Sequence, residues 1–162
     1  MGDFSDQVKA LKESLEAKSE ATRANVNQAV KNATLRIERE VKVSMRNTQT
    51  AEPGSLTRGG RLMGRPTTSA KGKASWHLPS APGFAPNPDT GALMASYTHE
   101  YQNDGNTGII GSKLEYAKWL EFGTSKMAAR PALGPAVQKV APMFKDDLKF
   151  SMAQPQIEAE SD

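Results

Sequence analysis

The stretch YAKWLEFGTSKMAARPALGPA, residues 116–136, decides how the second half of this 162-residue chain folds. Its opening predicts a short helix over residues 114–121. Tyr116, Trp119 and Leu120 are spaced i, i+3 and i+4, so they share one face of that helix. We expect the aromatic side chains here, Trp119 above all, to be buried either in the body of the protein or between subunits.

The helix is expected to end where Gly123 follows Phe122, because glycine readily adopts the positive φ that closes a helix. The same burial is expected for Phe122 as for the preceding aromatics. Thr124 can bond neighbouring backbone groups through its hydroxyl. A second helix is expected from about Pro135 to Met152, since proline fits the first helical position. Residues 116–136 thus predict a corner between two helices.

Charged residues lie on both sides of this corner. Glu121 precedes it, and Lys126 and Arg130 follow it, with Arg130 held extended by Pro131. We expect an ion pair of Glu121 with Arg130 or Lys126 to pin the corner. The corner is either an internal feature of the core or a surface shaped for a partner, and these residues alone leave both open.

The N-terminal region predicts one long amphipathic helix over residues 3–47, which contain no proline. The polar residues Lys18, Ser19, Thr22 and Asn25 interrupt its apolar stripe. We expect one face of this helix to pack on the domain and its far end to pack on a neighbour, with a sustained coiled coil as the alternative. The stripe consists of Phe4, Val8, Leu11 and Leu15, then Val26, Val30, Ala33, Ile37 and Val41.

The middle of the chain predicts a β-hairpin. Tyr97, His99 and Tyr101 alternate along a strand, the sequence Asn-Asp-Gly-Asn at 103–106 supplies a turn, and residues 107–110 return. A helical turn with Leu93 and Met94 is expected to follow Asp89, Thr90 and Gly91. The fold class is therefore α+β, with a long N-terminal helix and a small antiparallel sheet with packed helices.

Residues 51–88 form what we call the basic segment, which is rich in Gly, Pro, Ser and Thr. We expect a long irregular loop that becomes ordered against a partner, because unstructured loops of this length are uncommon in compact domains. From Pro53 to Pro88 the sequence has no acidic residue. The cations expected to make contacts are Arg58, Arg61, Arg65, Lys71 and Lys73.

The whole chain is expected to be one domain. It divides into the helix (1–50), the basic segment (51–88), a body (89–152) and an acidic tail (153–162). Hydrophobic residues make up 37% and aromatic residues 6%, which is thin for an isolated globule of this size and suggests burial shared with other subunits. There is no cysteine, and no apolar run reaches the roughly 20 residues that span a bilayer, so we expect no membrane partner.

Residues that could support catalysis do not gather in the sequence. His77 and His99 lie in different expected elements without ligand spacing around them. The run GGRLMGR at residues 59–65 lacks the lysine, the hydroxyl residue and the preceding strand of a phosphate-binding loop. No nucleophile has a base nearby in the sequence. We therefore expect no enzyme activity, no metal and no cofactor.

Two blocks of the sequence resemble those of a phage protein family. The first runs from residue 80 to residue 97 and the second is the corner, and their order and spacing both match. The chain is similar to the tail-completion, or head–tail joining, proteins of tailed bacteriophages of the Hong Kong 97 type. The matching residues are Ser80, Pro82, Gly83, Pro86, Asp89, Thr90, Gly91 and Leu93, then Tyr116, Ala117, Glu121, Phe122, Gly123, Thr124, Arg130, Pro131, Pro135 and Ala136.

This resemblance implies a non-enzymatic structural protein of the virion neck. Copies of the chain, most simply six, would form a ring that joins the tail to the head and contacts an adaptor, a stopper or a tail terminator. The protein would be found in the virion, and in the host cytoplasm during assembly.

The alternatives are a different neck layer or a small DNA-binding accessory protein that uses the basic segment. In a neck ring, the basic segment would dock against protein, line the DNA channel, or remain a solvated insertion.

Overall fold

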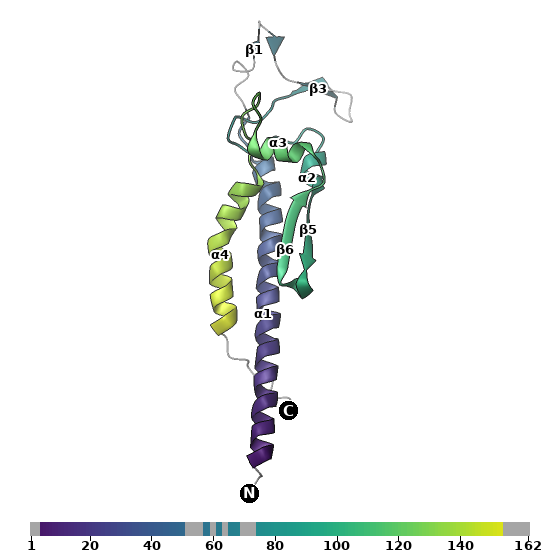
Figure 1. Ribbon diagram of the computed structural model, residues 1–162. Coiled ribbons are helices and arrows are strands. Elements are labelled where there is room, and N and C mark those ends of the chain that lie inside the picture. Colours follow the sequence, from purple (N-terminus) through teal and green to yellow (C-terminus); the bar gives the residue numbers. More distant parts are fainter. Residues whose placement is uncertain (1–3, 51–56, 59–60, 63–64, 69–73, 154–162) are drawn as a thin grey trace.

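The computed structural model describes residues 4–50, 57–58, 61–62, 65–68 and 74–153. Its axis is α1 (Phe4–Arg46), a single helix of 43 residues that runs along most of the molecule, with α3 and the strands β1 and β3 beyond its C-terminal end (Figure 1). At 1.5 Å per residue, this helix is about 65 Å long. The helix predicted over residues 3–47 is therefore observed, with ends that differ by one residue.

The remaining elements follow in an α+β arrangement, which confirms the expected fold class. The strands in the described part of the chain form three antiparallel pairs, β1–β2, β3–β4 and β5–β6. The elements are β1 (Thr57–Arg58), β2 (Arg61–Leu62), β3 (Arg65–Thr68), β4 (Ala74–His77), α2 (Ala92–Ser96), β5 (Tyr97–Gln102), η2 (Asn103–Gly105), β6 (Thr107–Ser112), α3 (Tyr116–Phe122) and α4 (Leu133–Ala153).

The expectation that the basic segment is irregular needs one correction. Its described residues include the strand pairs β1–β2 and β3–β4, and in the second pair Arg65 lies opposite His77. Glycine and proline are frequent throughout the segment and hid the pairing, because they weaken the period-2 signal by which strands are recognised.

The β5–β6 hairpin has the predicted strands and turn. Tyr97 pairs with Ser112 and Gln102 with Thr107, while Asn103 and Asp104 take positive φ values of 51° and 56° in the turn. Side chains on β5 alternate between covered and exposed, as the sequence predicts. The hairpin packs along α1, where the Asn27 side chain donates a hydrogen bond to the Asp104 carbonyl at 2.9 Å.

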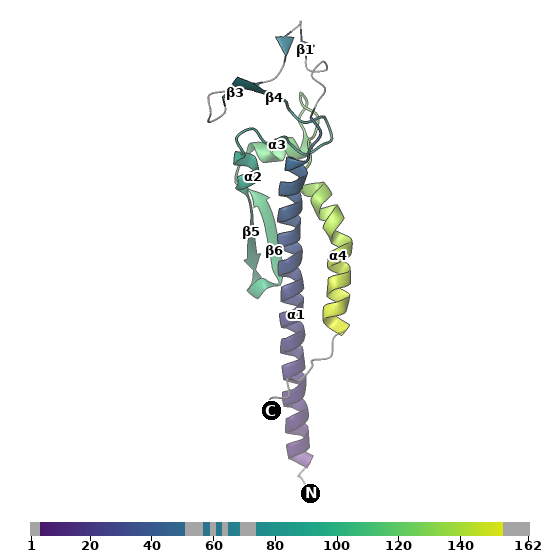
Figure 2. The ribbon, with the colours of Figure 1, turned by 180° about the vertical axis from the view of Figure 1, so that it is seen from behind.

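Helix α4 packs along α1 on the side away from the hairpin, as both ribbon views show (Figures 1 and 2). The two helices are antiparallel, and the ion pairs Lys139–Glu40 and Asp147–Arg36 join them. Helix α4 begins two residues before the expected Pro135. It continues through Pro142, although proline removes one helical hydrogen bond.

The hydrophobic core is small and lies at the C-terminal end of α1. Its buried members are Val41, Met45, Ala85, Tyr97, Ala132 and Ala136, with Ile37, Leu93, Met94 and Leu133 packed against them. Three of the six buried side chains are alanines, so little apolar surface is removed from water here. Within the described part of the chain, no helix has the length and apolarity needed to cross a membrane.

The N-terminal part of α1 extends beyond the rest of the fold. Residues 8–20 are all exposed, and neither α4 nor the hairpin reaches them in either view (Figures 1 and 2). We call residues 4–24 of α1 the arm.

Candidate functional site

The two sequence blocks of the resemblance fold into one unit at the C-terminal end of α1. The Gly83 N–H donates to the Ala129 carbonyl at 2.9 Å, and the Arg130 Nε donates to the Ser80 carbonyl at 3.1 Å. The Arg130 N–H also donates to the Leu120 carbonyl at 2.6 Å. The first two of these hydrogen bonds join residues that are some 50 positions apart in the sequence. Together, the three bonds hold α2 and α3 on either side of a shared space.

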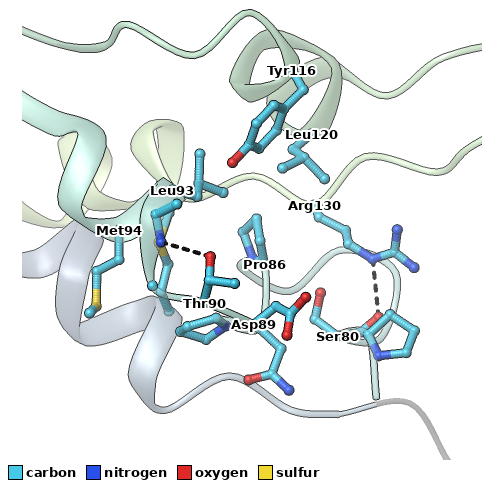
Figure 3. A pocket seen from close by; sticks show the side chains of 15 residues that line it. Ser80, Pro86, Asp89, Thr90, Leu93, Met94, Tyr116, Leu120 and Arg130 are labelled. Carbon is cyan, nitrogen blue, oxygen red and sulfur yellow. Dashed lines mark hydrogen bonds between the residues drawn. The ribbon is translucent and has the colours of Figure 1, made fainter. Parts of the chain in front are cut away.

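That space is a pocket of about 380 Å³ between the two blocks (Figure 3). In Figure 3, Tyr116 and Leu120 reach the pocket from α3, Leu93 and Met94 come from α2, and Arg130 comes from the chain before α4. Its walls combine apolar side chains with a few polar groups, among them Asp89 and Thr90, which is the usual composition of a binding site. The pocket therefore suits a protruding side chain or a short peptide.

The Asp-Thr-Gly motif opens α2 at the edge of this pocket. The Ala92 N–H donates to the Thr90 hydroxyl oxygen at 3.3 Å, which satisfies one amide at the start of this short helix. Gly91 has a φ of 81° and precedes the first helical residue. Leu93 is half-buried against the core. The motif thus serves local structure, while Asp89 lines the pocket.

The expected ion pair of Glu121 with Arg130 or Lys126 is wrong. The Glu121 carboxylate instead accepts three backbone hydrogen bonds at the start of α4, from Ala132 at 2.9 Å, Leu133 at 3.1 Å and Gly134 at 2.7 Å. A carboxylate at a helix N-terminus satisfies the free amides and interacts favourably with the helix dipole. Arg130 binds the Ser80 carbonyl instead. The corner is therefore held together by a side chain of α3 that caps the N-terminus of α4.

Gly123 ends α3, as predicted, with its N–H donating to the Trp119 carbonyl at 2.8 Å. Its φ is 75°, but its ψ of −177° places it outside the left-handed helical region that was expected. Thr124 and Met127 then exchange backbone hydrogen bonds of 2.8 and 3.2 Å, and the Lys126 N–H donates to the Thr124 hydroxyl oxygen at 3.3 Å. The chain turns tightly here and returns through Pro131 to α4.

The aromatic side chains of α3 are less buried than expected. Phe122 is 83% exposed and Trp119 is 48% exposed, so burial of both in the body of this chain is wrong. Tyr116 is 39% exposed although it lines the pocket. Of the three residues predicted to share a face, Tyr116 and Leu120 line the pocket and Trp119 does not. The spacing alone cannot show which side chains this chain covers. The other expectation, burial between subunits, remains a prediction.

Tyr97 is a buried residue whose role the sequence did not indicate. It is 4% exposed, and burial together with the nearby Glu121 charge raises its pKa to about 12. Glu121 therefore faces Tyr97 on one side and the start of α4 on the other. The absence of an Asn, Asp, Ser or Thr before Leu133 was the one signal in the sequence that α4 needs a cap from elsewhere.

A second polar cluster lies on the hairpin side of α1, away from the pocket. Glu38 binds both Lys42 and His99, and these contacts, Lys42 first, lower the pKa of Glu38 below its usual value. The cluster ties β5 to α1. The sequence placed His99 in the expected strand, and its contact with Glu38 also makes it an anchor of the hairpin on α1.

The structure describes only part of the basic segment. The backbones of Arg58, Arg61 and Arg65 lie in β1, β2 and β3. Their side chains, together with Lys71 and Lys73, lie outside the described residues, and so does the acidic tail beyond residue 153. Among the residues that the structure does describe, no three His, Cys, Asp or Glu side chains gather in a way that could hold a metal ion.

Comparisons with family models, with curated proteins and with solved structures find no match to this chain.

Proposed function

We propose that this protein is a structural component of the bacteriophage neck, a tail-completion protein whose copies form a ring that joins the tail to the head. The observation that carries the proposal is the convergence of the two sequence blocks. Arg130 of the second block binds Ser80 of the first, and both blocks line one pocket. Motifs that act together in assembly are expected to share a surface in this way.

The exposed surface of the chain supports a protein that works in an assembly. Among the described residues, several large apolar side chains are uncovered, including Leu11 and Leu15 of the arm, at 60% and 58% exposed, and Phe122 of α3, at 83% exposed. A ring would cover such surface through head-to-tail contacts that close only at the correct rotation, and six is the copy number that the resemblance implies.

The corner offers a suitable contact surface for a neighbouring copy or another neck protein. Trp119 and Phe122 are exposed on α3, the helix whose Tyr116 and Leu120 line the pocket, and aromatic side chains are enriched at the centres of protein interfaces. Glu121 of the same helix accepts hydrogen bonds from the first amides of α4, and Arg130 after the turn binds the Ser80 carbonyl. The aromatic side chains are thus presented on a rigid support, which lowers the entropy cost of binding.

A small DNA-binding accessory protein is the second candidate, favoured by the five cations of the basic segment. Such a protein would bind DNA with an affinity that falls steeply with salt, since each phosphate neutralised adds roughly 0.9 to the salt slope. A neck protein should instead co-purify with virions at a few copies per particle.

The deciding experiment removes the gene from the phage. We expect filled heads and finished tails that fail to join, or joined particles that leak DNA, when lysates are viewed by electron microscopy. Supplying the wild-type chain from a plasmid should restore joined particles. Normal infectious particles without the protein would refute the proposal, and absence of the chain from purified virions would favour the DNA-binding alternative.

A further inference from the structure

The arm carries an apolar stripe that no described part of this chain covers. Val8, Leu11 and Leu15 are 49%, 60% and 58% exposed, and their spacing places them on one face of α1. Lys12, four residues after Val8, borders this stripe, while Glu13 and Glu16 lie further around the helix. An uncovered stripe of large apolar side chains on a projecting helix is typical of a surface that binds a partner.

A groove of matching character lies further along the molecule. It is a cavity of about 310 Å³ formed where α1, β6 and α4 meet. None of the residues that line it is charged. Val30 and Ile37 from α1, Ile110 from β6, and Val137, Val140 and Phe144 from α4 provide most of its apolar walls.

The groove and the stripe have the same length. The stripe runs from Val8 to Leu15, and the groove walls run from Val30 to Ile37 and from Val137 to Phe144. Each is a step of seven residues, or about 10 Å along a helix axis. The apolar stripe, with Lys12 at its edge, would thus meet an uncharged groove over two helical turns, as an amphipathic helix does when it binds in a hydrophobic groove.

The arm cannot bind the groove of its own chain. Both belong to α1, which is continuous from Phe4 to Arg46, and the 15 residues from Leu15 to Val30 separate them by about 22 Å of helix. An arm bound in this groove must therefore come from another molecule. A second copy is the most economical choice, because every copy has one arm and one groove, and their pairing is head to tail.

We propose that the arm of one copy binds in the α1–β6–α4 groove of a second copy. This inference rests on the proposed function, because it names the surfaces that would join neighbouring copies in the ring. The contact uses the face of the molecule between α4 and the hairpin and leaves the pocket at the corner open for a different neck protein.

Disulfide trapping tests the contact directly, because the natural chain has no cysteine. A Leu11→Cys protein mixed with a Val137→Cys protein is expected to give a mixed disulfide dimer under mild oxidation. The matched control replaces Leu11→Cys by Leu35→Cys, since Leu35 is a 49% exposed leucine of the same helix outside both the arm and the groove. Efficient dimers of Leu11→Cys alone would show an arm-to-arm coiled coil and overturn the proposal.

Self-association in solution gives an independent measurement. By analytical ultracentrifugation, Leu11→Glu and Val137→Glu are each expected to weaken association about tenfold or more, while Leu35→Glu leaves it unchanged. Circular dichroism and melting would show that the variants are folded. A wild-type chain that stays monomeric at its highest soluble concentration, or a Leu11→Glu chain that associates like wild type, would overturn the proposal.

These outcomes separate the inference from the proposed function. If the protein is found in virions but Leu11→Glu associates normally, the arm contact fails and the neck function stands. If arm and groove are trapped together but the chain is absent from virions, the neck function fails and the contact between copies stands.

Discussion

At the scale of single residues, the corner depends on Glu121 because α4 has no cap of its own. The chain enters α4 through Pro131 and Ala132, neither of which has a side chain that could accept a hydrogen bond. Both carboxylate oxygens of Glu121, which belongs to α3, accept hydrogen bonds from the first amides of α4 instead. Pro135, in the first turn of α4, has no N–H group and so needs no acceptor. One carboxylate therefore fixes the relative position of two helices.

Replacing this carboxylate by an amide should weaken the fold. In Glu121→Gln the side-chain NH₂ would face backbone donors, and the favourable interaction with the helix dipole would be lost. We expect the free energy of unfolding to fall by about 2 kcal/mol in urea denaturation. Glu115→Gln, an exposed site just before α3, is the matched control and should change stability by less than about 0.5 kcal/mol. Equal effects at both positions would contradict the capping role.

Gly123 is constrained by both its dihedral angles and its surroundings. A φ of 75° with a ψ of −177° is essentially restricted to glycine, and a Cβ atom would lie 2.9 Å from the Ala129 nitrogen and the Met127 oxygen. We expect Gly123→Ala to cost about 3 kcal/mol in urea denaturation. Gly111→Ala is the control, because a Cβ there meets nothing within 4 Å. A near-neutral Gly123→Ala would show that the turn can rearrange.

Tyr97 should make stability fall at alkaline pH. Its pKa is raised to about 12 in the folded chain, against about 10 in an unfolded chain. Below pH 10 both states hold the proton and the contribution is fully present. Between pH 10 and 12 only the unfolded state loses the proton, so stability declines by about 2–3 kcal/mol in total. The difference in phenolate absorbance between wild type and Tyr97→Phe should titrate near pH 12, and a midpoint near pH 10 would refute the buried environment.

At the scale of elements, the hairpin packs on α1 through an unusually close approach. A Cβ atom at Gly108 of β6 would lie 2.0 Å from the Thr34 hydroxyl oxygen, and Thr34 is 4% exposed with its hydroxyl donating to the Val30 carbonyl. Glycine is required here for space, and its φ is not the reason. The hairpin can lie flat on α1 only because this position has no side chain.

A double-mutant cycle should show this packing. Gly108→Ala alone is expected to cost about 2–3 kcal/mol, because overpacking forces β6 away from α1. Adding Thr34→Ala removes the Thr34 Oγ1 and Cγ2 atoms, at 2.0 and 3.2 Å, and leaves the Thr34 Cβ at 3.1 Å, so the double variant should recover part of that loss. Strictly additive costs would contradict a direct clash.

The sequence predicted elements well where one local rule was sufficient. The apolar stripe gave α1, the alternation of Tyr97, His99 and Tyr101 gave β5, and the Asn-Asp-Gly-Asn turn gave the hairpin. It failed where the partner is distant in the chain. The Glu121 cap and the Gly108–Thr34 contact join residues from different elements, so no local pattern contains them. The pairing of β3 with β4 was obscured by turn-forming residues.

At the scale of the whole molecule, the fold divides its apolar residues between a small core and several uncovered surfaces. The buried cluster around Val41 and Met45 holds the chain together. The arm, the groove and the exposed aromatic residues of α3 contribute little to that cluster. A composition with only 37% hydrophobic residues is consistent with this division, since part of the apolar surface would be buried only on assembly.

This division predicts that stability and assembly respond to different substitutions. Phe122 is 83% exposed, so Phe122→Ala removes little buried area and should change the free energy of unfolding by less than about 1 kcal/mol. If α3 meets a neighbouring protein, the same variant should fail to restore joined particles to a phage that lacks the gene. Met45 is only 1% exposed, so Met45→Ala should have the opposite effect and lower the free energy of unfolding by about 2–5 kcal/mol in urea denaturation.

Met45→Ala should nevertheless support joining at a temperature where it remains folded, because Met45 borders the corner pocket but is only 1% exposed and so offers a partner almost no contact area. Wild-type joining by Phe122→Ala would exclude the aromatic face of α3 from the interface, and the exposure of Phe122 would then have no role in assembly. A large loss of stability in Phe122→Ala would instead mean that the side chain packs against its own chain in solution.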